Sequence, residues 1–128
     1  MEIFGIGIDV IEVERIEKAI VESGDRFLDR VFTVDERSYC NKQTRPVIHF
    51  AARWAAKEAV AKALGTGIGE SLSWQDMEIV RLPSGEPEMT LRGGGRQFVE
   101  EHGITLIKIS LTHARNYAAA NAVVMSNR

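Results

Sequence analysis

Two carboxylates and one ammonium group in this sequence are of the types that a phosphate site with a metal ion uses. Asp9 ends a segment in which every second residue back to position 5 is glycine. Glu58 and Lys62 lie four residues apart, just before the turn Gly65–Gly69. Two carboxylates from different elements could hold Mg²⁺, whose other ligands are often waters and substrate phosphates. The lysine and the N–H groups of the glycine turn could bind those phosphates. These residues favour metal-assisted phosphate chemistry.

Each of these groups also has an ordinary structural interpretation. Asp9 with Glu12 fits a capping box for a following helix, and spacing alone prefers this interpretation. Glu58 and Lys62 could form an exposed salt bridge worth about 0.3 kcal/mol. The pattern favours neither that bridge nor a half-buried pair kept for chemistry. His113 is in register with apolar neighbours, so a core histidine fits at least as well as a ligand contact.

A long helix is predicted to carry Glu58 and Lys62. It starts just after Pro46, is rich in Ala, Lys, Glu and Leu, and is followed by Gly65 as a helix-ending residue. At about 100° per residue, its apolar residues form one arc and its alanines the opposite side. The apolar arc contains Val47, Phe50, Trp54, Ala61 and Leu64, and the alanine side contains Ala52, Ala55, Ala56, Ala59 and Ala63. Both sides are predicted to pack, with the Glu58–Lys62 pair in the seam.

Asp9 is predicted to lie on a strand that runs from Ile3 to Ile11. Period-two alternation separates its residues into two faces. One face has Phe4, Ile6, Ile8 and Val10, and the other has Ile3, Gly5, Gly7, Asp9 and Ile11. The glycines would let a ligand or another backbone approach Asp9 closely.

The remaining segments complete one α+β domain over residues 1–128, in which a strand and helices precede a mainly antiparallel sheet. Helices are predicted over residues 13–24 and 25–32, and from a capping box at Thr33 and Glu36 to about Lys42. A hairpin of residues 77–82 and 88–91 follows. Gly93–Gly95 is predicted to be a flexible break before a short helix that ends at residues 102–103. Strands over residues 104–112 and 117–125 close the domain.

Composition restricts the class of protein. A net charge of −2 argues against a general nucleic-acid binder, while residues 31–65 hold six basic and three acidic residues, which suits a small molecule carrying phosphate. Cys40 is the only cysteine and is interpreted as structural, which predicts a reducing, cytoplasmic setting. The start MEIFGIGIDV resembles neither a signal peptide nor a membrane span. Walker, dinucleotide, HExxH, paired-cysteine and GxSxG patterns are absent from the sequence.

Five stretches, spread in order over nearly the whole chain, carry a family resemblance. They are GIGIDVIEVERI, FTVDE, FAARWAAKEAVAKALGTGIG, LSWQDMEI with SGEP, and ISLTHARNYAAANAVV. An early GIGxD combined with WAAKEAxxKAxGTGI is highly specific. On these residues the chain resembles the holo-acyl-carrier-protein synthases, the short bacterial phosphopantetheinyl transferases.

The resemblance implies an activity in fatty acid biosynthesis. This activity is the Mg²⁺-dependent transfer of 4′-phosphopantetheine from coenzyme A to a serine of apo-acyl carrier protein, which leaves adenosine 3′,5′-bisphosphate. Asp9 and Glu58 match the family's metal ligands, and Lys62 matches the lysine that contacts the coenzyme A phosphates. All three are implied to be catalytic. Either Glu58 or a metal-bound water could accept the proton of the serine.

The resemblance also implies binding residues and an assembly. Coenzyme A contacts are implied for Arg53, Lys62, Gly65, Thr66, Gly67, Ile68 and His113. Acyl carrier protein contacts are implied for Arg15, Arg26 and Phe27. The implied assembly is a homotrimer with active sites between subunits, without nucleic-acid or membrane partners.

Two other functions fit the same residues. A Mg²⁺-dependent pyrophosphate hydrolase acting on coenzyme A-like nucleotides would need Asp9, Glu58 and Lys62 but no protein acceptor. A non-catalytic coenzyme A-binding module would keep its ligand after loss of Glu58 and the metal. A structural trimer subunit without a ligand would leave the position of these groups unexplained.

Overall fold

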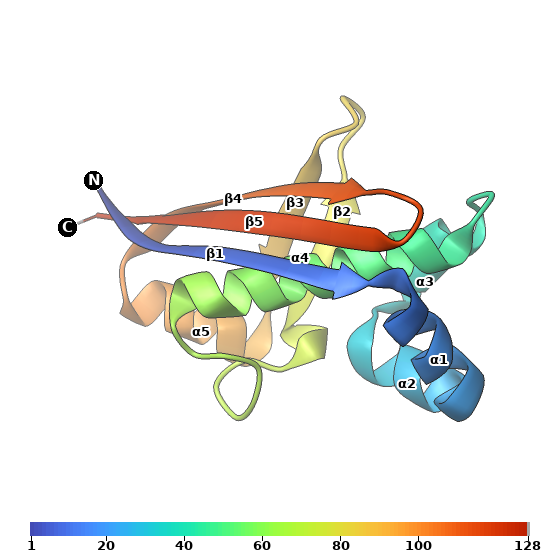
Figure 1. Ribbon diagram of the computed structural model, residues 1–128. Coiled ribbons are helices and arrows are strands. Elements are labelled where there is room, and N and C mark those ends of the chain that lie inside the picture. Colours follow the sequence, from blue (N-terminus) through green and yellow to red (C-terminus); the bar gives the residue numbers. More distant parts are fainter. Residues whose placement is uncertain (128) are drawn as a thin grey trace.

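The computed structural model describes residues 1–127 and consists of one long helix packed on a three-stranded antiparallel sheet (Figure 1). The strand order is β1-β5-β4, helix α4 contacts all three strands, and a β2-β3 hairpin lies beside β4. In chain order the elements are β1 (Glu2–Glu12), α1 (Val13–Ser23), α2 (Asp25–Val31), α3 (Val34–Asn41), α4 (Pro46–Leu64), η1 (Trp74–Asp76), β2 (Met77–Arg81), β3 (Pro87–Leu91), α5 (Gly93–Glu101), β4 (Ile104–His113) and β5 (Tyr117–Ser126). The predicted α+β class and antiparallel sheet are confirmed.

Helix α4 begins and ends where the sequence predicts. Pro46 occupies its first turn, where a missing N–H costs nothing, and Gly65 adopts the left-handed conformation at φ 80° that ends it. Its alanines are buried, and Phe50 and Leu64 are buried on the apolar arc. Among residues 1–127, no helix combines the length and the apolar character that a membrane span requires.

Strand β1 lies directly against the backbone of α4 because two of its residues have no side chain. A Cβ on Gly5 would lie 1.8 Å from the carbonyl oxygen of Ala63, and a Cβ on Gly7 would lie 1.8 Å from that of Ala59. Two strand residues advance about 6.6 Å and four helix residues about 6 Å, so the contact repeats with each turn. The glycine track therefore accommodates another backbone, and it brings the carboxylate of Asp9 to the surface of α4.

Helices α1 to α3 pack at one end of α4 (Figure 1). Helix α1 buries Val13 and Ile16. The predicted capping box of α3 is confirmed, since the Thr33 side chain accepts from the Glu36 N–H while Glu36 accepts from the Thr33 N–H. The Glu36 side chain is also buried, which a capping box by itself does not require.

The predicted alternation of β1 is wrong at its first residues. A β-bulge interrupts the register between Ile3 and Gly5. Before a bulge the alternation is reversed relative to the residues after it. Ile3 is accordingly exposed, whereas the Phe4 ring packs edge-on against Phe98 of α5 at a centroid distance of 6.3 Å.

Gly93–Gly95 is not the flexible break that the sequence predicts, because α5 begins at Gly93. A Cβ on Gly94 would lie 2.9 Å from the Ser71 carbonyl oxygen, and one on Gly95 would lie 2.9 Å from the Leu72 side chain. The glycines thus allow the first turn of α5 to pack closely on the segment before η1. The physical requirement is close approach rather than flexibility.

Candidate active site

The Lys62 side chain joins helix α4 to strand β1. Its Nζ lies 3.0 Å from Asp9 Oδ1 and donates to the Ile8 carbonyl oxygen at 3.0 Å. The Asp9 side chain is only 13% exposed, against 52% for Lys62. Among the ion pairs of the described residues, Lys62 is paired with Asp9 and not with Glu58, so the i,i+4 bridge that the sequence left open is not formed. Lys62 has instead a partner on a different element.

Asp9 does not cap helix α1. The N-cap residue is Glu12, and no side chain makes a capping hydrogen bond there. The preferred structural interpretation of Asp9 is therefore wrong, because β1 continues to Glu12 and directs the Asp9 side chain toward α4. Its second oxygen, Oδ2, is buried and has no hydrogen-bond partner in the described chain. A buried carboxylate oxygen without a partner is costly unless a cation or ligand contacts it.

Glu58 lies within electrostatic reach of Asp9. Burial raises the pKa of Glu58, the negative charge of Asp9 raises it further, and Lys62 opposes both effects. Two partly buried carboxylates that disfavour each other's charge are suited to a divalent cation, which would relieve the repulsion. Residues 1–127 contain no cluster of three His, Cys, Asp or Glu side chains that could hold a metal. Asp9 and Glu58 fit a Mg²⁺ ion whose remaining ligands are waters and phosphate oxygens.

The glycine turn after α4 uses its N–H groups to end the helix. Gly65 N–H donates to the Lys62 carbonyl oxygen at 3.0 Å, and the N–H groups of Thr66 and Gly67 donate to that of Ala61 at 3.2 Å. The Gly69 N–H donates to the Leu72 carbonyl oxygen at 2.9 Å. The prediction that these N–H groups form a phosphate cradle is therefore wrong for all four. Ile68 packs against the core and anchors the turn beside Lys62.

A second cluster on α4 is cationic and aromatic. The Arg53 guanidinium lies 4.2 Å from the centre of the Tyr39 ring, the residue is only 5% exposed, and its Nε has no partner. Arg81 on β2 donates to the Tyr39 hydroxyl at 3.0 Å. His113 at the end of β4 is exposed, so its interpretation as a core histidine is wrong. Its ring lies 5.0 Å from that of His49.

Among residues 1–127, no carboxylate forms an ion pair with this second cluster. The ion pairs of the described chain include none with Arg53, Arg81, His49 or His113. Tyr39, His49 and Arg81 were not predicted as site residues. The sequence signal was a basic residue at every fourth position, at Arg45 just before α4 and at His49, Arg53 and Lys57 within it. Uncompensated cations of this kind favour binding of an anion.

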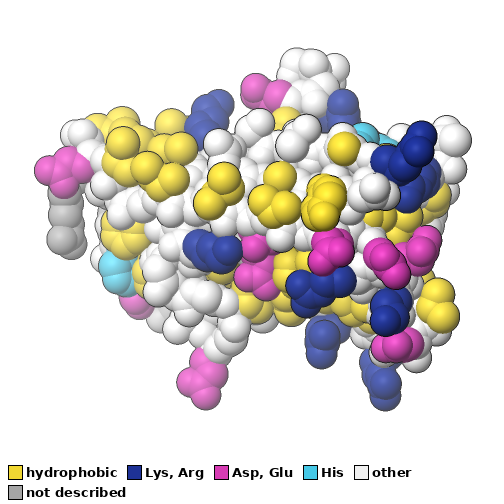
Figure 2. All heavy atoms as spheres, viewed as in Figure 1, with side chains coloured by type: hydrophobic (Ala, Val, Ile, Leu, Met, Phe, Trp, Pro, Cys, Tyr) yellow, Lys and Arg dark blue, Asp and Glu magenta, His cyan; other side chains and the backbone are white. Residues whose placement is uncertain are grey.

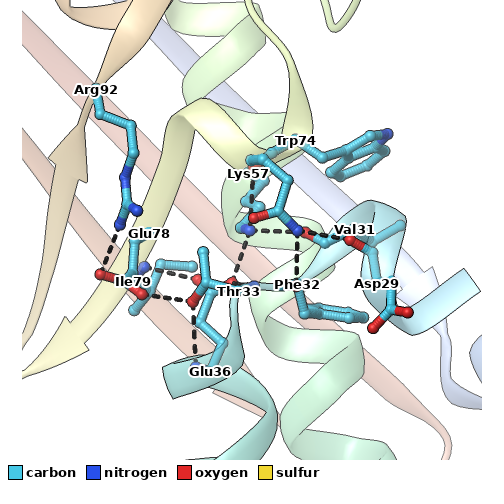
Figure 3. Close-up of polar contacts among 11 residues, drawn as sticks. Asp29, Val31, Phe32, Thr33, Glu36, Lys57, Trp74, Glu78, Ile79 and Arg92 are labelled. Atoms are coloured by element: carbon cyan, nitrogen blue, oxygen red, sulfur yellow. Dashed lines mark hydrogen bonds and ion pairs between the residues drawn. The ribbon is translucent and has the colours of Figure 1, made fainter. Parts of the chain in front are cut away.

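A buried polar network fixes α4 to the segments around it (Figure 3). Lys57 Nζ lies 2.7 Å from Glu36 Oε1 and donates to the carbonyl oxygens of Val31 at 2.7 Å and Trp74 at 3.2 Å. Glu36 Oε2 accepts from the Ile79 N–H at 2.7 Å. The network therefore connects α4 to α3, η1 and β2. It fixes the helix one residue before Glu58, and it was not predicted from the sequence.

The predicted carrier-protein residues lie at the helical end of the molecule. Arg15 and Arg26 are exposed on α1 and α2. Phe27 is only 8% exposed, and its ring packs edge-on against Phe32 at 6.1 Å. A cavity of about 350 Å³ is lined by Ser23, Arg26, Phe27 and Arg30. A partner at this surface would meet two arginines and the edge of one aromatic ring.

Comparisons with known proteins extend over nearly the whole chain. Residues 5–122 match the sequence model of the 4′-phosphopantetheinyl transferase superfamily. A holo-[acyl-carrier-protein] synthase of Chlamydia pneumoniae is 44% identical over 126 residues, which cover 98% of this chain and 100% of that protein. The crystal structure of holo-[acyl-carrier-protein] synthase from Neisseria meningitidis is similar with a TM-score of 0.91 and 32% identity, covering 97% of this chain and 99% of that one.

A further similar structure contains a ligand. Helicobacter pylori holo-[acyl-carrier-protein] synthase in complex with coenzyme A is 32% identical with a TM-score of 0.84, covering 94% of this chain and 99% of that one. Sequence, length and fold agree across these comparisons, and the chain has the paired carboxylates and lysine on which the resemblance rests. The chain belongs to the 4′-phosphopantetheinyl transferase superfamily and, within it, to the holo-[acyl-carrier-protein] synthases.

Proposed function

We propose that this enzyme transfers the 4′-phosphopantetheine group of coenzyme A to a serine of an apo-acyl carrier protein, in a Mg²⁺-dependent reaction that releases adenosine 3′,5′-bisphosphate. The observation that carries the proposal is the pair Asp9 and Glu58, in which one carboxylate has an oxygen without a partner and the other a raised pKa. The family match over residues 5–122 supports this assignment.

The transfer exchanges one phosphorus–oxygen bond for another. The serine oxygen attacks the phosphorus that bears pantetheine, and the bond from that phosphorus to the bridging oxygen of the pyrophosphate breaks. The serine loses its proton, and the adenosine bisphosphate leaves with the bridging oxygen. Such transfers need in-line placement and neutralisation of charge more than covalent help from the protein.

Three side chains supply these requirements. Asp9 and Glu58 hold the cation, which when bound supplies positive charge to the pyrophosphate. Either Glu58 or a water molecule beside it would accept the serine proton. Lys62 is half exposed and held by Asp9, so its ammonium can turn to the phosphates and offset charge on the leaving group. Lys62 thus exchanges one anionic partner for another when the substrate binds.

Coenzyme A extends from this centre along α4 in our proposal. Arg53 and His113, which belong to the cationic cluster, bind coenzyme A. The turn of Gly65, Thr66, Gly67 and Ile68 lies alongside it. Because the N–H groups of Gly65, Thr66 and Gly67 end the helix, these residues contact coenzyme A through other atoms. The carrier protein, whose family is acidic, docks on Arg15 and Arg26 and meets Phe27 at the edge of its ring.

The proposed assembly is a homotrimer in the cytoplasm, with active sites between subunits. It is supported by the sheet face opposite α4, where Ile6, Ile8 and Val10 are 65%, 66% and 60% exposed. Figure 2 shows hydrophobic side chains in a row across this face, along the line of β1 in Figure 1. A continuous apolar row of this kind is expected to be covered by another surface.

Intact-protein mass spectrometry tests the reaction. An apo-acyl carrier protein is incubated with the enzyme, coenzyme A and Mg²⁺, and parallel reactions contain chelator or the variants Asp9→Ala and Glu58→Ala. We expect one phosphopantetheine to be added, and the addition to be lost with chelator and in both variants. An unmodified carrier with cleaved coenzyme A would support a pyrophosphate hydrolase. An unmodified carrier with intact coenzyme A would support a binding module, once a second carrier protein had given the same result.

A further inference from the structure

We propose that His49 is a proton-linked positioning residue of the coenzyme A site, which orients His113 and takes up a proton when a phosphate monoester binds at the cationic cluster. This inference rests on the proposed function, because it assumes that coenzyme A binds at Arg53 and His113. It adds a residue that the family resemblance does not include. It also adds a dependence of substrate binding on pH.

The geometry of two aromatic contacts carries the positioning role. The His49 ring lies 5.0 Å from the His113 ring with an interplanar angle of 63°, and 6.1 Å from the Tyr39 ring with an angle of 73°. Both are edge-to-face contacts, which restrict ring orientation. His113 is exposed at the end of β4, so the His49 ring supplies a fixed surface for it. Tyr39 is itself held by Arg53 and Arg81, and the five residues form one contiguous group.

The charges around His49 explain why its proton would be linked to binding. His113 on β4, Arg53 on its own helix and Arg81 on β2 face it, together with the neutral Tyr39 on α3. Burial lowers the pKa of His49 below its usual value, and the charges of His113, Arg53 and Arg81 lower it further. The ring is therefore neutral near pH 7 while the site is empty. A phosphate dianion among these groups offsets their positive charge and so favours the imidazolium form.

The direction of the pH dependence follows from this shift. If the bound complex has the higher pKa for His49, the complex holds a proton that the free enzyme does not, and lowering the pH favours binding. The phosphate monoester has its own second pKa near 6 and opposes this trend at lower pH. The two effects are separable because the titration of the phosphate is the same for every variant. The difference between wild type and a His49 variant isolates the histidine.

Calorimetric titration with adenosine 3′,5′-bisphosphate measures the linkage directly. Titrations near pH 7 in two buffers of different ionisation enthalpy give the number of protons taken up on binding. We expect proton uptake by wild type, and about threefold to tenfold tighter binding at pH 6.5 than at pH 7.5. His49→Phe keeps an aromatic edge for His113 but cannot take up a proton, so its uptake should fall and its pH dependence should flatten. His102→Gln, which alters a histidine stacked on Phe98, is the matched control and should behave as wild type.

A second measurement reads the pKa of His49 in wild type and uses variants only to assign the signals. The sequence has three histidines, so their C2 protons can be assigned by NMR with His102→Gln and His49→Phe, and titrated in wild type with and without the bisphosphate. A rise of the His49 pKa on binding supports the proposal. Binding without this rise, with equal proton uptake in wild type and His49→Phe, overturns it and leaves the proposed function intact. Failure of wild type to bind either the bisphosphate or coenzyme A would overturn both.

Discussion

Lys57 and Glu36 form an ion pair that is closed to solvent, with Nζ and Oε1 2.7 Å apart and both side chains 0% exposed. Each charge is surrounded by further partners. The ammonium also bonds two carbonyl oxygens, and the carboxylate accepts from the N–H groups of Thr33 and Ile79. A buried charge that keeps all its partners is tolerated, whereas one that loses its counter-ion is strongly unfavourable. The pair is therefore expected to control the stability of the helix that carries Glu58.

Removing one member of this pair should destabilise the protein more than removing both. We expect Lys57→Met or Glu36→Gln to lower the free energy of unfolding in urea by about 3–5 kcal/mol, because each leaves an unpaired buried charge. The double variant should lose less than the sum of the two. Arg96→Ala is the control, since its contact with Glu100 is exposed, and it should change stability by about 0.5 kcal/mol or less. Additive losses in the double variant would contradict a coupled pair.

The ionised Glu58 side chain should lower the stability of the fold when no metal is bound. Its pKa in the folded protein is raised above 4.5, so the folded state holds the proton more tightly than the unfolded chain. The cost of ionising Glu58 in the fold therefore appears as pH rises through and above this window. In metal-free buffer at pH 7, Glu58→Gln should raise the melting temperature slightly, because the free energy of unfolding should increase by less than about 1 kcal/mol for a group that is half exposed.

The Glu58→Gln variant should have the melting temperature of wild type in acid, and Mg²⁺ should not change that temperature. Well below the ordinary pKa of glutamate the side chain is protonated in both states of wild type, so the gain from Glu58→Gln should vanish. Millimolar Mg²⁺ should raise the melting temperature of wild type but not that of the variant. Thermal scans with chelator and with Mg²⁺ measure both effects. Equal stabilisation of wild type and variant by Mg²⁺ would place the metal elsewhere.

Gly7 should tolerate no side chain. A Cβ there would meet the Ala59 carbonyl oxygen at 1.8 Å, and neither the strand nor the helix backbone can move away cheaply. We expect Gly7→Ala to cost about 3 kcal/mol or more, with loss of Mg²⁺-dependent stabilisation because Asp9 shifts with the strand. Gly69→Ala is the matched control. A Cβ at Gly69 has no atom within 4 Å, so its effect on the urea midpoint should be small.

Arg15 should contribute to transfer but not to binding of coenzyme A. It is exposed on α1, where a carrier protein with acidic residues would dock. Arg15→Glu is expected to reduce transfer to the carrier by about tenfold, with the loss decreasing at higher salt, while the dissociation constant for coenzyme A stays unchanged. Arg96→Glu makes the same change of net charge on α5 and should keep wild-type transfer. Parallel loss of coenzyme A binding in Arg15→Glu would show that the arginine does not act through docking.

Ile8 should be required for subunit association. Its side chain is 66% exposed on the open face of the sheet. It also lines a cavity of about 210 Å³, together with residues of β4 and β5. We expect Ile8→Lys to sediment as a monomer and to lose activity, because a charge there would have to be buried between subunits. Val21→Lys, at a similarly exposed residue on α1, should keep the wild-type assembly. A trimeric Ile8→Lys variant would exclude this face from the interface.

Local signals were sufficient to predict most of the fold. Pro46 and Gly65 delimit α4, and Thr33 with Glu36 opens α3, because these signals act within one or two turns of the residues that show them. The β-bulge before Gly5 and the close packing of Gly94 depend on elements far along the chain. At the β-bulge the side chains do not follow strict alternation, so the sequence pattern predicted the wrong face of the strand. At Gly94 the glycine allows close packing, so the glycine-rich composition wrongly predicted a flexible segment.

The site was predicted by residue type and not by pairing. Asp9, Glu58 and Lys62 were selected correctly as neighbours, but helical spacing suggested Lys62 with Glu58, whereas its partner is Asp9, more than fifty residues away. The same limit hid Lys57 and Glu36, since a capping-box glutamate gives no sign of a buried second partner. His49 was missed because the four-residue spacing of basic residues does not show which of them face a shared site. His113, which lies against it, comes from the last hairpin.

The order of strands in the sheet has a consequence for how the enzyme is made. Within residues 1–127, the sheet neighbour of β1 is β5, which pairs Glu2 with Ser126 and Asp9 with Ala120. During synthesis, therefore, the first strand has no sheet partner among the described strands until β5 has been translated. Until then β1 is not paired in a sheet and its apolar residues are uncovered, a state that favours contact with chaperones or other chains. We therefore expect the site around Asp9 to assemble only after β5 has been translated and has paired with β1.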